Sequence, residues 1–166
     1  MYRGYFVVNK MDPSGKTTVA NPIAFLCSRA VAGVAQSDLR SGTTLERDLG
    51  GNRRGNAFQH CYVACRVLIA CGLNGAVSWD GRETPGTPGG DMDLANNRQG
   101  YEIGIGNGTS AEDCWNGCKE KWESGELDCL GKPCPPPRPC DFGPNPLGYP
   151  RLIRDNTTNG TFGSGS

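Results

Sequence analysis

Apolar and polar positions in the central part of the chain follow helical spacing, and capping and terminating residues divide this part into separate helices. Asn21 followed by Pro22 is typical of a helix start, since asparagine caps the first turn and proline fits its first position. The clearest helical pattern begins at Asn56 as the cap and stops at Gly72. Residues 110–113 have the Ser-x-x-acid spacing of a capping box, with Asp in place of the usual Glu. The predicted helices cover residues 22–35, 56–71, 73–79, 91–103 and 110–123.

The remaining segments are predicted to be strand, turn and loop. Residues 5–8 suggest a short strand, residues 12–15 a turn, and the polar, glycine-rich residues 37–55 and 81–90 two loops. No periodic pattern remains beyond Gly131. The sequence therefore predicts a mainly α fold: a small, disulfide-stapled helical domain of about four to five helices, with a long irregular Pro/Gly-rich C-terminal tail.

The length of 166 residues suits one domain with flanking segments. We expect a leader over residues 1–20, a helical domain over 21–130 and an irregular tail rich in cysteine and proline over 131–166. No window approaches ~18 consecutive apolar residues, so we expect no membrane span.

Charge is balanced overall but uneven along the chain. The sequence has 17 Lys and Arg against 17 Asp and Glu; residues 1–82 carry a surplus of +5 and residues 83–130 a surplus of −7. Zero net charge removes the simplest argument for nucleic-acid binding, which needs a basic surface. A nuclease is not excluded, because it requires only a local basic cleft.

Nine cysteines favour an exported protein held together by disulfides, and the odd number leaves at least one thiol over. The first ten residues do not have the pattern of a secretory signal, so we expect the chain to be a piece of a larger exported protein. Cys134 and Cys140 flank a proline run, and we expect them to staple the tail together with Cys129.

Two cysteine pairs have a spacing of four residues and so lie on one helix face each: Cys61 with Cys65, and Cys114 with Cys118. Two such helices side by side can be joined by two disulfides. The same four thiolates can instead hold a tetrahedral zinc ion. We favour disulfides, because structural zinc sites usually use tighter spacings.

Candidate chemistry gathers around the single histidine of the chain. It is followed by two acidic segments, residues 80–83 and 91–100, and the second contains two adjacent asparagines. Paired asparagines are unusual inside a helix, because their side chains compete for backbone hydrogen bonds, which suggests a buried network or a site. The candidate catalytic residues are His60, Asp80, Glu83, Asp93, Asn96 and Asn97.

Two chemistries fit a convergence of these residues. One imidazole with two or three oxygen ligands suits a divalent metal that activates water. Without a metal, His60 or Glu83 can act as a general base oriented by a carboxylate. The simpler interpretation is that a lone helical histidine is a structural, hydrogen-bonded residue. The motifs of nucleophilic serine enzymes, phosphate loops, helical zinc proteases and zinc deaminases are absent from the sequence.

These segments resemble a known kind of domain. Residues 56–62 (Asn-Ala-Phe-Gln-His-Cys-Tyr), 80–83 (Asp-Gly-Arg-Glu), 93–100 (Asp-Leu-Ala-Asn-Asn-Arg-Gln-Gly) and 114–118 (Cys-x-x-x-Cys) resemble an uncharacterised C-terminal domain of RHS-repeat proteins. The resemblance covers residues 52–126, with Gln59 where arginine is common. Residues 12–15 are similar to the Asp-Pro-x-Gly turn at which an RHS core ends, which would make residues 1–20 an RHS-core-like leader.

The resemblance implies a toxin tip of a polymorphic toxin used in bacterial competition, secreted within a larger protein and delivered to a target cell. Such tips are commonly toxins, and many are nucleases. The resemblance also implies two partners, an RHS shell and a cognate immunity protein. We expect a hydrolase acting on nucleic acid with a His/carboxylate site, for which a divalent metal ion is the candidate cofactor. Arg53, Arg54 and Arg98 are the candidate substrate-binding residues. A hydrolase of peptidoglycan or another envelope polymer is the alternative, since disulfides persist there. A non-enzymatic binding module stays open as well.

Overall fold

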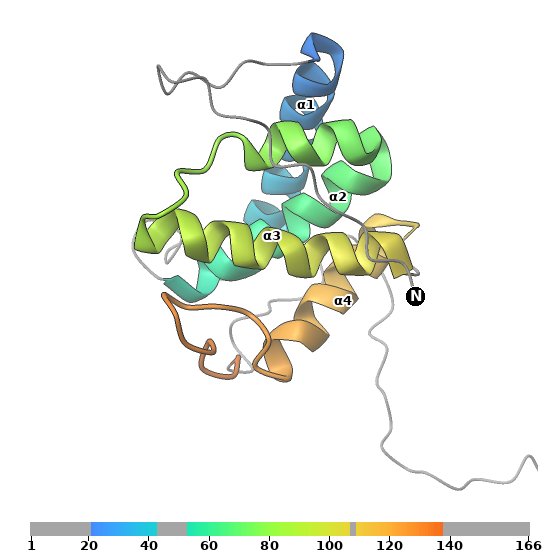
Figure 1. Ribbon diagram of the computed structural model, residues 1–166. Coiled ribbons are helices and arrows are strands. Elements are labelled where there is room, and N and C mark those ends of the chain that lie inside the picture. Colours follow the sequence, from blue (N-terminus) through green and yellow to red (C-terminus); the bar gives the residue numbers. More distant parts are fainter. Residues whose placement is uncertain (1–20, 43–52, 107–108, 138–166) are drawn as a thin grey trace, which may run out of the picture.

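The computed structural model describes residues 21–42, 53–106 and 109–137, which form four helices and an irregular C-terminal segment (Figure 1). The helices are α1 (Pro22–Gly42), α2 (Arg53–Asp80), α3 (Pro88–Gly106) and α4 (Ala111–Glu123). Within the described ranges, β pairing is limited to an isolated bridge between Asp128 and Pro133. The prediction of a mainly α, disulfide-stapled fold is confirmed. The predicted strand at 5–8, the turn at 12–15 and the tail beyond residue 137 lie outside the described residues.

Two helix starts follow the caps predicted from the sequence. The Asn21 side-chain oxygen accepts hydrogen bonds from the backbone N–H groups of Ile23 and Ala24, both at 3.1 Å. Ser110 Oγ accepts the backbone N–H of Asp113 at 3.1 Å, and the Asp113 carboxylate accepts the Ser110 N–H at 3.0 Å. The capping box of α4 is therefore confirmed, with Asp in the place of Glu.

Other helix bounds differ from the prediction, because tertiary contacts extend the helices into polar segments. α1 continues to Gly42, so the loop expected from residue 37 is wrong over 37–42: Leu39 is buried there, and Asp38 pairs with Arg66 of α2 at 2.7 Å. α2 begins at Arg53, which places the expected cap Asn56 inside the helix.

α2 has a kink at Gly72, where the backbone is non-helical with φ of 64°. A positive φ of this kind costs glycine little, since it lacks a Cβ atom. The sequence predicted a helix end at this glycine and a short helix over 73–79. Both features are present as two helical segments of α2 that continue across the kink.

Disulfides join α2 to two other helices and close the C-terminal segment. The pairs are Cys27–Cys71, Cys61–Cys118, Cys65–Cys114 and Cys129–Cys134. The four-residue pairs on α2 and α4 thus form two disulfides, as favoured, and not a zinc site. Their crossed numbering shows that α2 and α4 run antiparallel. Cys140 lies outside the described residues.

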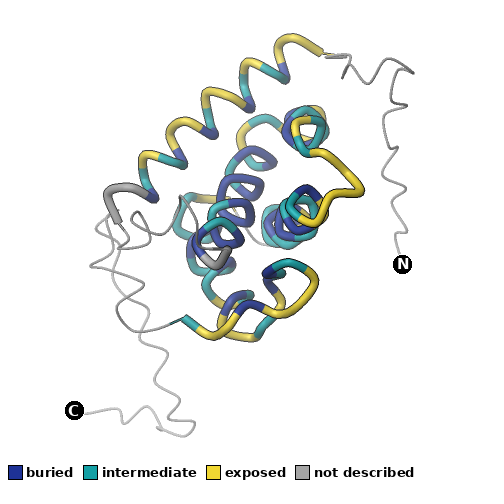
Figure 2. Tube along the Cα trace, turned by 90° about the vertical axis from the view of Figure 1, so that its left-hand side faces the viewer, coloured by how far each residue is buried: buried dark blue, intermediate teal, exposed yellow. Residues whose placement is uncertain are grey.

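α2 is the central helix of the bundle, with buried side chains on most of its first segment (Figure 2). α1 shows the opposite pattern, with one buried stripe and an exposed outer face. Within the described ranges, one stretch, Gly55–Asp80, is long and apolar enough to cross a membrane, and half of its most apolar window is buried in the bundle. The expected absence of a membrane span stays a prediction.

Candidate functional site

The candidate site forms where the first segment of α2 packs beside α3. Asn56 Nδ2 donates to Asp93 Oδ1 at 2.8 Å, and one turn further the His60 and Asn97 side chains are 3.1 Å apart. Both pairs are separated by 37 residues, so the two helix segments run parallel in a fixed register. Polar residues at i and i+4 on each helix therefore face each other across the interface.

A glycine allows this close approach. A Cβ atom placed on Gly100 would lie 2.1 Å from the backbone oxygen of Cys61, far inside any normal contact. Gly100 follows Asn97 by about one helical turn, and Cys61 is the neighbour of His60. The missing side chain therefore lets α3 lie against the α2 backbone at the point where the two polar pairs meet.

Asn97 is fully buried and fixes the protonation pattern of the histidine. Its Oδ1 accepts from Trp79 Nε1 at 3.2 Å, and its Nδ2 donates to Asp80 Oδ1 at 2.9 Å. Because the indole can only donate and the carboxylate accepts, these two contacts determine the orientation of the amide. The same Oδ1 faces His60 Nδ1, so Nδ1 carries the hydrogen and Nε2 of the neutral ring carries a lone pair.

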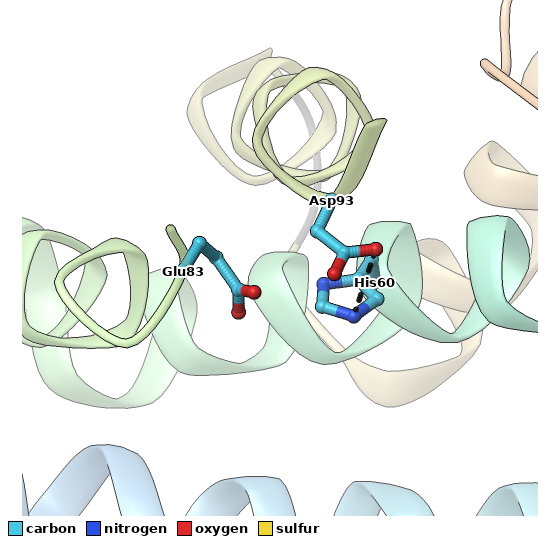
Figure 3. Close-up of side chains that lie close together, drawn as sticks. All are labelled: His60, Glu83 and Asp93. Carbon is cyan, nitrogen blue, oxygen red and sulfur yellow. Dashed lines mark ion pairs between the residues drawn. The ribbon is translucent and has the colours of Figure 1, made fainter. Parts of the chain in front are cut away.

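Two carboxylates lie beside the His60 ring, and one of them, that of Asp93, faces its Nε2 atom (Figure 3). Asp93 Oδ1 of α3 lies 3.3 Å from it, and Glu83 reaches the same volume from the loop that follows α2. One ligand atom from each residue lies within 4.8 Å of the other two. We call His60, Glu83 and Asp93 the acid–imidazole cluster. Its histidine and aspartate side chains are 11% and 17% exposed, so the cluster is largely buried but still in contact with solvent.

Burial dominates the electrostatics of the cluster. It lowers the pKa of His60, against the opposing effects of the Asp93 charge and the Asn97 hydrogen bond. Burial, followed by the charge of Asp93 and a hydrogen bond with it, raises the pKa of Glu83 to about 7. Burial also raises the pKa of Asp80, although Tyr101 and Asn97 donate to its carboxylate. Burial therefore disfavours both the protonated imidazole of His60 and the ionised carboxylates of Glu83 and Asp80.

An exposed arginine beside the cluster is absent from the sequence-based list of site residues. The Arg82 guanidinium lies 4.2 Å from the ring centroid of Trp79, and its positive charge acts on both His60 and Glu83. Its position between Asp80 and Glu83 was the available sequence signal. Arg98, which the sequence did suggest, is exposed on α3, and its charge acts on Asp80.

The predicted residues divide into three groups. His60, Glu83 and Asp93 converge. Asp80 and Asn97 lie behind the histidine and hold it. Asn96 lies apart: its side chain bonds the Met92 carbonyl and both backbone groups of Asp128, each at 2.9 Å, so it anchors the C-terminal segment. The structure therefore does not bring Asn96 into the cluster, because adjacent helical residues point about 100° apart, and its role in catalysis stays a prediction.

Two other features lie outside the cluster. Arg53 and Arg54 begin α2, and their side chains lie outside the described residues. An open groove of about 400 Å³ lies between α1, α2 and the start of α4, with Val31, Val34 and Ile69 in its wall. The groove is lined by none of the cluster residues.

Comparisons of this chain with protein-family models, curated proteins and solved structures found no match.

Proposed function

We propose that this chain is a hydrolytic effector domain of an exported RHS-type protein, and that its substrate is nucleic acid. The observation that carries the proposal is the acid–imidazole cluster, in which the His60 imidazole and two carboxylates converge and Nε2 lies 3.3 Å from Asp93 Oδ1. A water molecule there has a base within reach. The buried bonds of Asn97 hold the imidazole in the tautomer that leaves Nε2 free to accept a proton.

In the proposed reaction a water oxygen attacks the phosphorus of a phosphodiester, the new P–O bond forms and the bond to the leaving oxygen breaks. His60 Nε2 lies where it can accept the water proton, while Asn97 is a positioning residue behind the ring. Asp80 and Trp79 in turn hold Asn97. This two-layer arrangement is what preorganised active sites require.

Two arginines support a polyanionic substrate. Arg82 is exposed beside the cluster and stacks on Trp79, which leaves its planar guanidinium available to a phosphate group. Arg98 is exposed on α3, and its charge acts on Asp80 behind the cluster. A guanidinium near the attacked phosphate also stabilises the negative charge that develops in the transition state.

The disulfides favour a second candidate, a hydrolase of an envelope polymer. Four disulfides among the described residues are compatible with an extracellular protein. An effector acting in the periplasm would keep all of them. The two candidates share the cluster and differ in substrate and compartment.

The test is growth of bacteria that express the chain in the cytoplasm or direct it to the periplasm, beside the His60→Ala variant. Killing in the cytoplasm that requires His60, with degraded nucleic acid, supports the main proposal. Killing in the periplasm alone supports the envelope hydrolase. Folded protein that kills in neither compartment contradicts both and favours a binding module built on a buried polar network.

A matched pair of arginine variants tests the substrate in vitro. Arg82→Ala removes a guanidinium stacked on Trp79 at the cluster, whereas Arg29→Ala removes one stacked 5.7 Å from the Phe25 ring on α1. On nucleic-acid substrates we expect Arg82→Ala to raise KM and Arg29→Ala to leave it unchanged. Equal behaviour of the two variants contradicts the role of Arg82.

A further inference from the structure

We propose that the acid–imidazole cluster is a binding site for one divalent transition-metal ion, with His60 Nε2, Glu83 and Asp93 as ligands. The inference deepens the proposed function and rests on it for the substrate. With an ion bound, His60 Nε2 would be a ligand and not the base, and the ion would supply the activation of the attacking water in its place. Binding of the ion is a property of the folded chain and is tested separately below.

The first support is that three side chains able to act as metal ligands converge on one volume. Asn97 takes the Nδ1 hydrogen of His60, so Nε2 presents a lone pair to Asp93 Oδ1 at 3.3 Å. Glu83 brings a second carboxylate to the same volume. Lone pairs gathered in this way repel one another unless a positive charge lies between them.

The second support is the spacing. Metal bonds to imidazole nitrogen and carboxylate oxygen are about 2.0–2.2 Å long, so neighbouring ligand atoms of one ion lie roughly 3.0–3.5 Å apart. The 3.3 Å separation of His60 Nε2 and Asp93 Oδ1 falls in that range. Glu83, half-buried in the loop after α2, offers a third ligand atom within 4.8 Å of one from each of the other two residues.

The third support comes from the residues that hold the ligands in place by hydrogen bonds. A metal-binding histidine usually donates its other ring N–H to a carbonyl or carboxylate oxygen, and Asn97 Oδ1 takes that role here. Ligating carboxylates are likewise held by hydrogen bonds, and Asn56 Nδ2 holds Asp93 Oδ1 at 2.8 Å. Two of the three ligands thus have a fixed orientation before an ion arrives.

The ligand chemistry selects the class of ion. One imidazole nitrogen with two carboxylates suits Zn²⁺ or Mn²⁺ better than Ca²⁺ or Mg²⁺, which prefer oxygen ligands alone. Three protein ligands leave at least one position for water, the pattern of catalytic rather than structural sites. A water bound there is acidified toward neutral pH, and Arg82 lies beside the cluster to receive the phosphate group of a substrate.

The binding test uses the full chain with its disulfides intact, freed of metal with a chelator and titrated with Zn²⁺ and, separately, Mn²⁺ by calorimetry. We expect one ion per chain at the cluster. Glu83→Gln, Asp93→Asn and His60→Gln should each weaken binding by more than about tenfold, the least that loss of even an outer-shell partner typically costs. Glu123→Gln, on the exposed end of α4, is the matched control and should bind as the wild type does.

Circular dichroism of each variant confirms the fold, and Glu83→Gln keeps the test valid if a helix variant unfolds, because Glu83 lies in a loop. The inference is overturned if neither ion binds at millimolar concentration. It is also overturned if binding is the same in the cluster variants and in Glu123→Gln.

Hydrolysis of single- and double-stranded nucleic acid, with and without chelator, separates this inference from the proposed function. Binding that depends on the cluster, without hydrolysis, supports the metal site and contradicts the proposed function. Hydrolysis that requires His60 and continues unchanged in chelator supports the proposed function and overturns the metal site.

Discussion

Replacing Asn97 with alanine tests whether the buried network holds the site, and the structure gives its magnitude. The substitution leaves Trp79 Nε1 and His60 Nδ1 without their acceptor, and Asp80 loses one of its two side-chain donors while keeping Tyr101. Each buried group left without a partner costs about 1–3 kcal/mol, so two such groups cost about 2–6 kcal/mol. Because a whole domain is stable by only about 5–15 kcal/mol, this loss should be conspicuous.

The assay is guanidinium unfolding of the oxidised protein, followed by far-ultraviolet circular dichroism and tryptophan fluorescence. Asn74→Ala, at an exposed position of α2, is the control and should change the free energy of unfolding by less than about 0.5 kcal/mol. An Asn97→Ala variant within about 1 kcal/mol of the wild type would refute the reasoning, since it would mean that the network contributes little.

Asn97→Asp supplies a second, pH-dependent check. It puts a carboxylate oxygen where Nδ2 now lies 2.9 Å from Asp80 Oδ1, and two carboxylates at that distance must share a proton. The folded variant then binds more protons than the unfolded chain above pH ~5, so its stability falls as pH rises toward 8. The deficit of Asn97→Ala relative to wild type should not grow in this way. A flat profile for Asn97→Asp contradicts the close contact between this side chain and Asp80.

Three further predictions concern the scaffold, each measured by chemical unfolding. Gly100→Ala should cost about 1–3 kcal/mol, because its Cβ would meet backbone 2.1 Å away, whereas Gly89→Ala, with no such neighbour, should be neutral or slightly stabilising. Replacing both Cys65 and Cys114 with alanine should lower the free energy of unfolding by only about 3 kcal/mol, because the Cys61–Cys118 disulfide still joins α2 to α4 and the lost bond closes a ring of about ten residues. Removing both α2–α4 disulfides should cost about 7 kcal/mol. Hydrogen bonds from residues 109 and 110 lower the pKa of Asp113 in the folded state. The stability that the Asp113 carboxylate contributes is therefore present above its unfolded-state pKa and is lost as pH falls through its folded-state pKa. Asp113→Ala should cost about 1 kcal/mol at pH 7, and the difference from wild type should shrink below pH ~4.

Local features of the sequence predicted much of the fold. The caps at Asn21 and Ser110 and the kink at Gly72 depend on hydrogen bonds and dihedral angles within a few residues, so the sequence alone reveals them. The extension of α1 to Gly42 does not, because it depends on burial of Leu39 against other helices.

The site was predictable only in part. The spacing of Asn56 from His60 and of Asp93 from Asn97 is four residues in both cases, and two polar stripes of equal spacing were a signal that these faces meet. The different roles of Asn96 and Asn97 follow from which neighbours pack on each side of α3. No local pattern contains that information. The position of Glu83 likewise depends on how the loop after α2 returns to α3.

The disulfides do not by themselves decide in which compartment the chain acts. Reduction requires a thiolate to reach a disulfide sulfur, and the four cysteines that join α2 to α4 are fully buried, whereas Cys27 and Cys71 are partly exposed. A reducing environment should therefore release α1 first. The acid–imidazole cluster lies on α2, α3 and the loop between them, and α1 supplies none of its ligands. The scaffold of the site can thus outlast its most accessible disulfide, so the disulfides do not contradict the proposed action on nucleic acid in the cytoplasm.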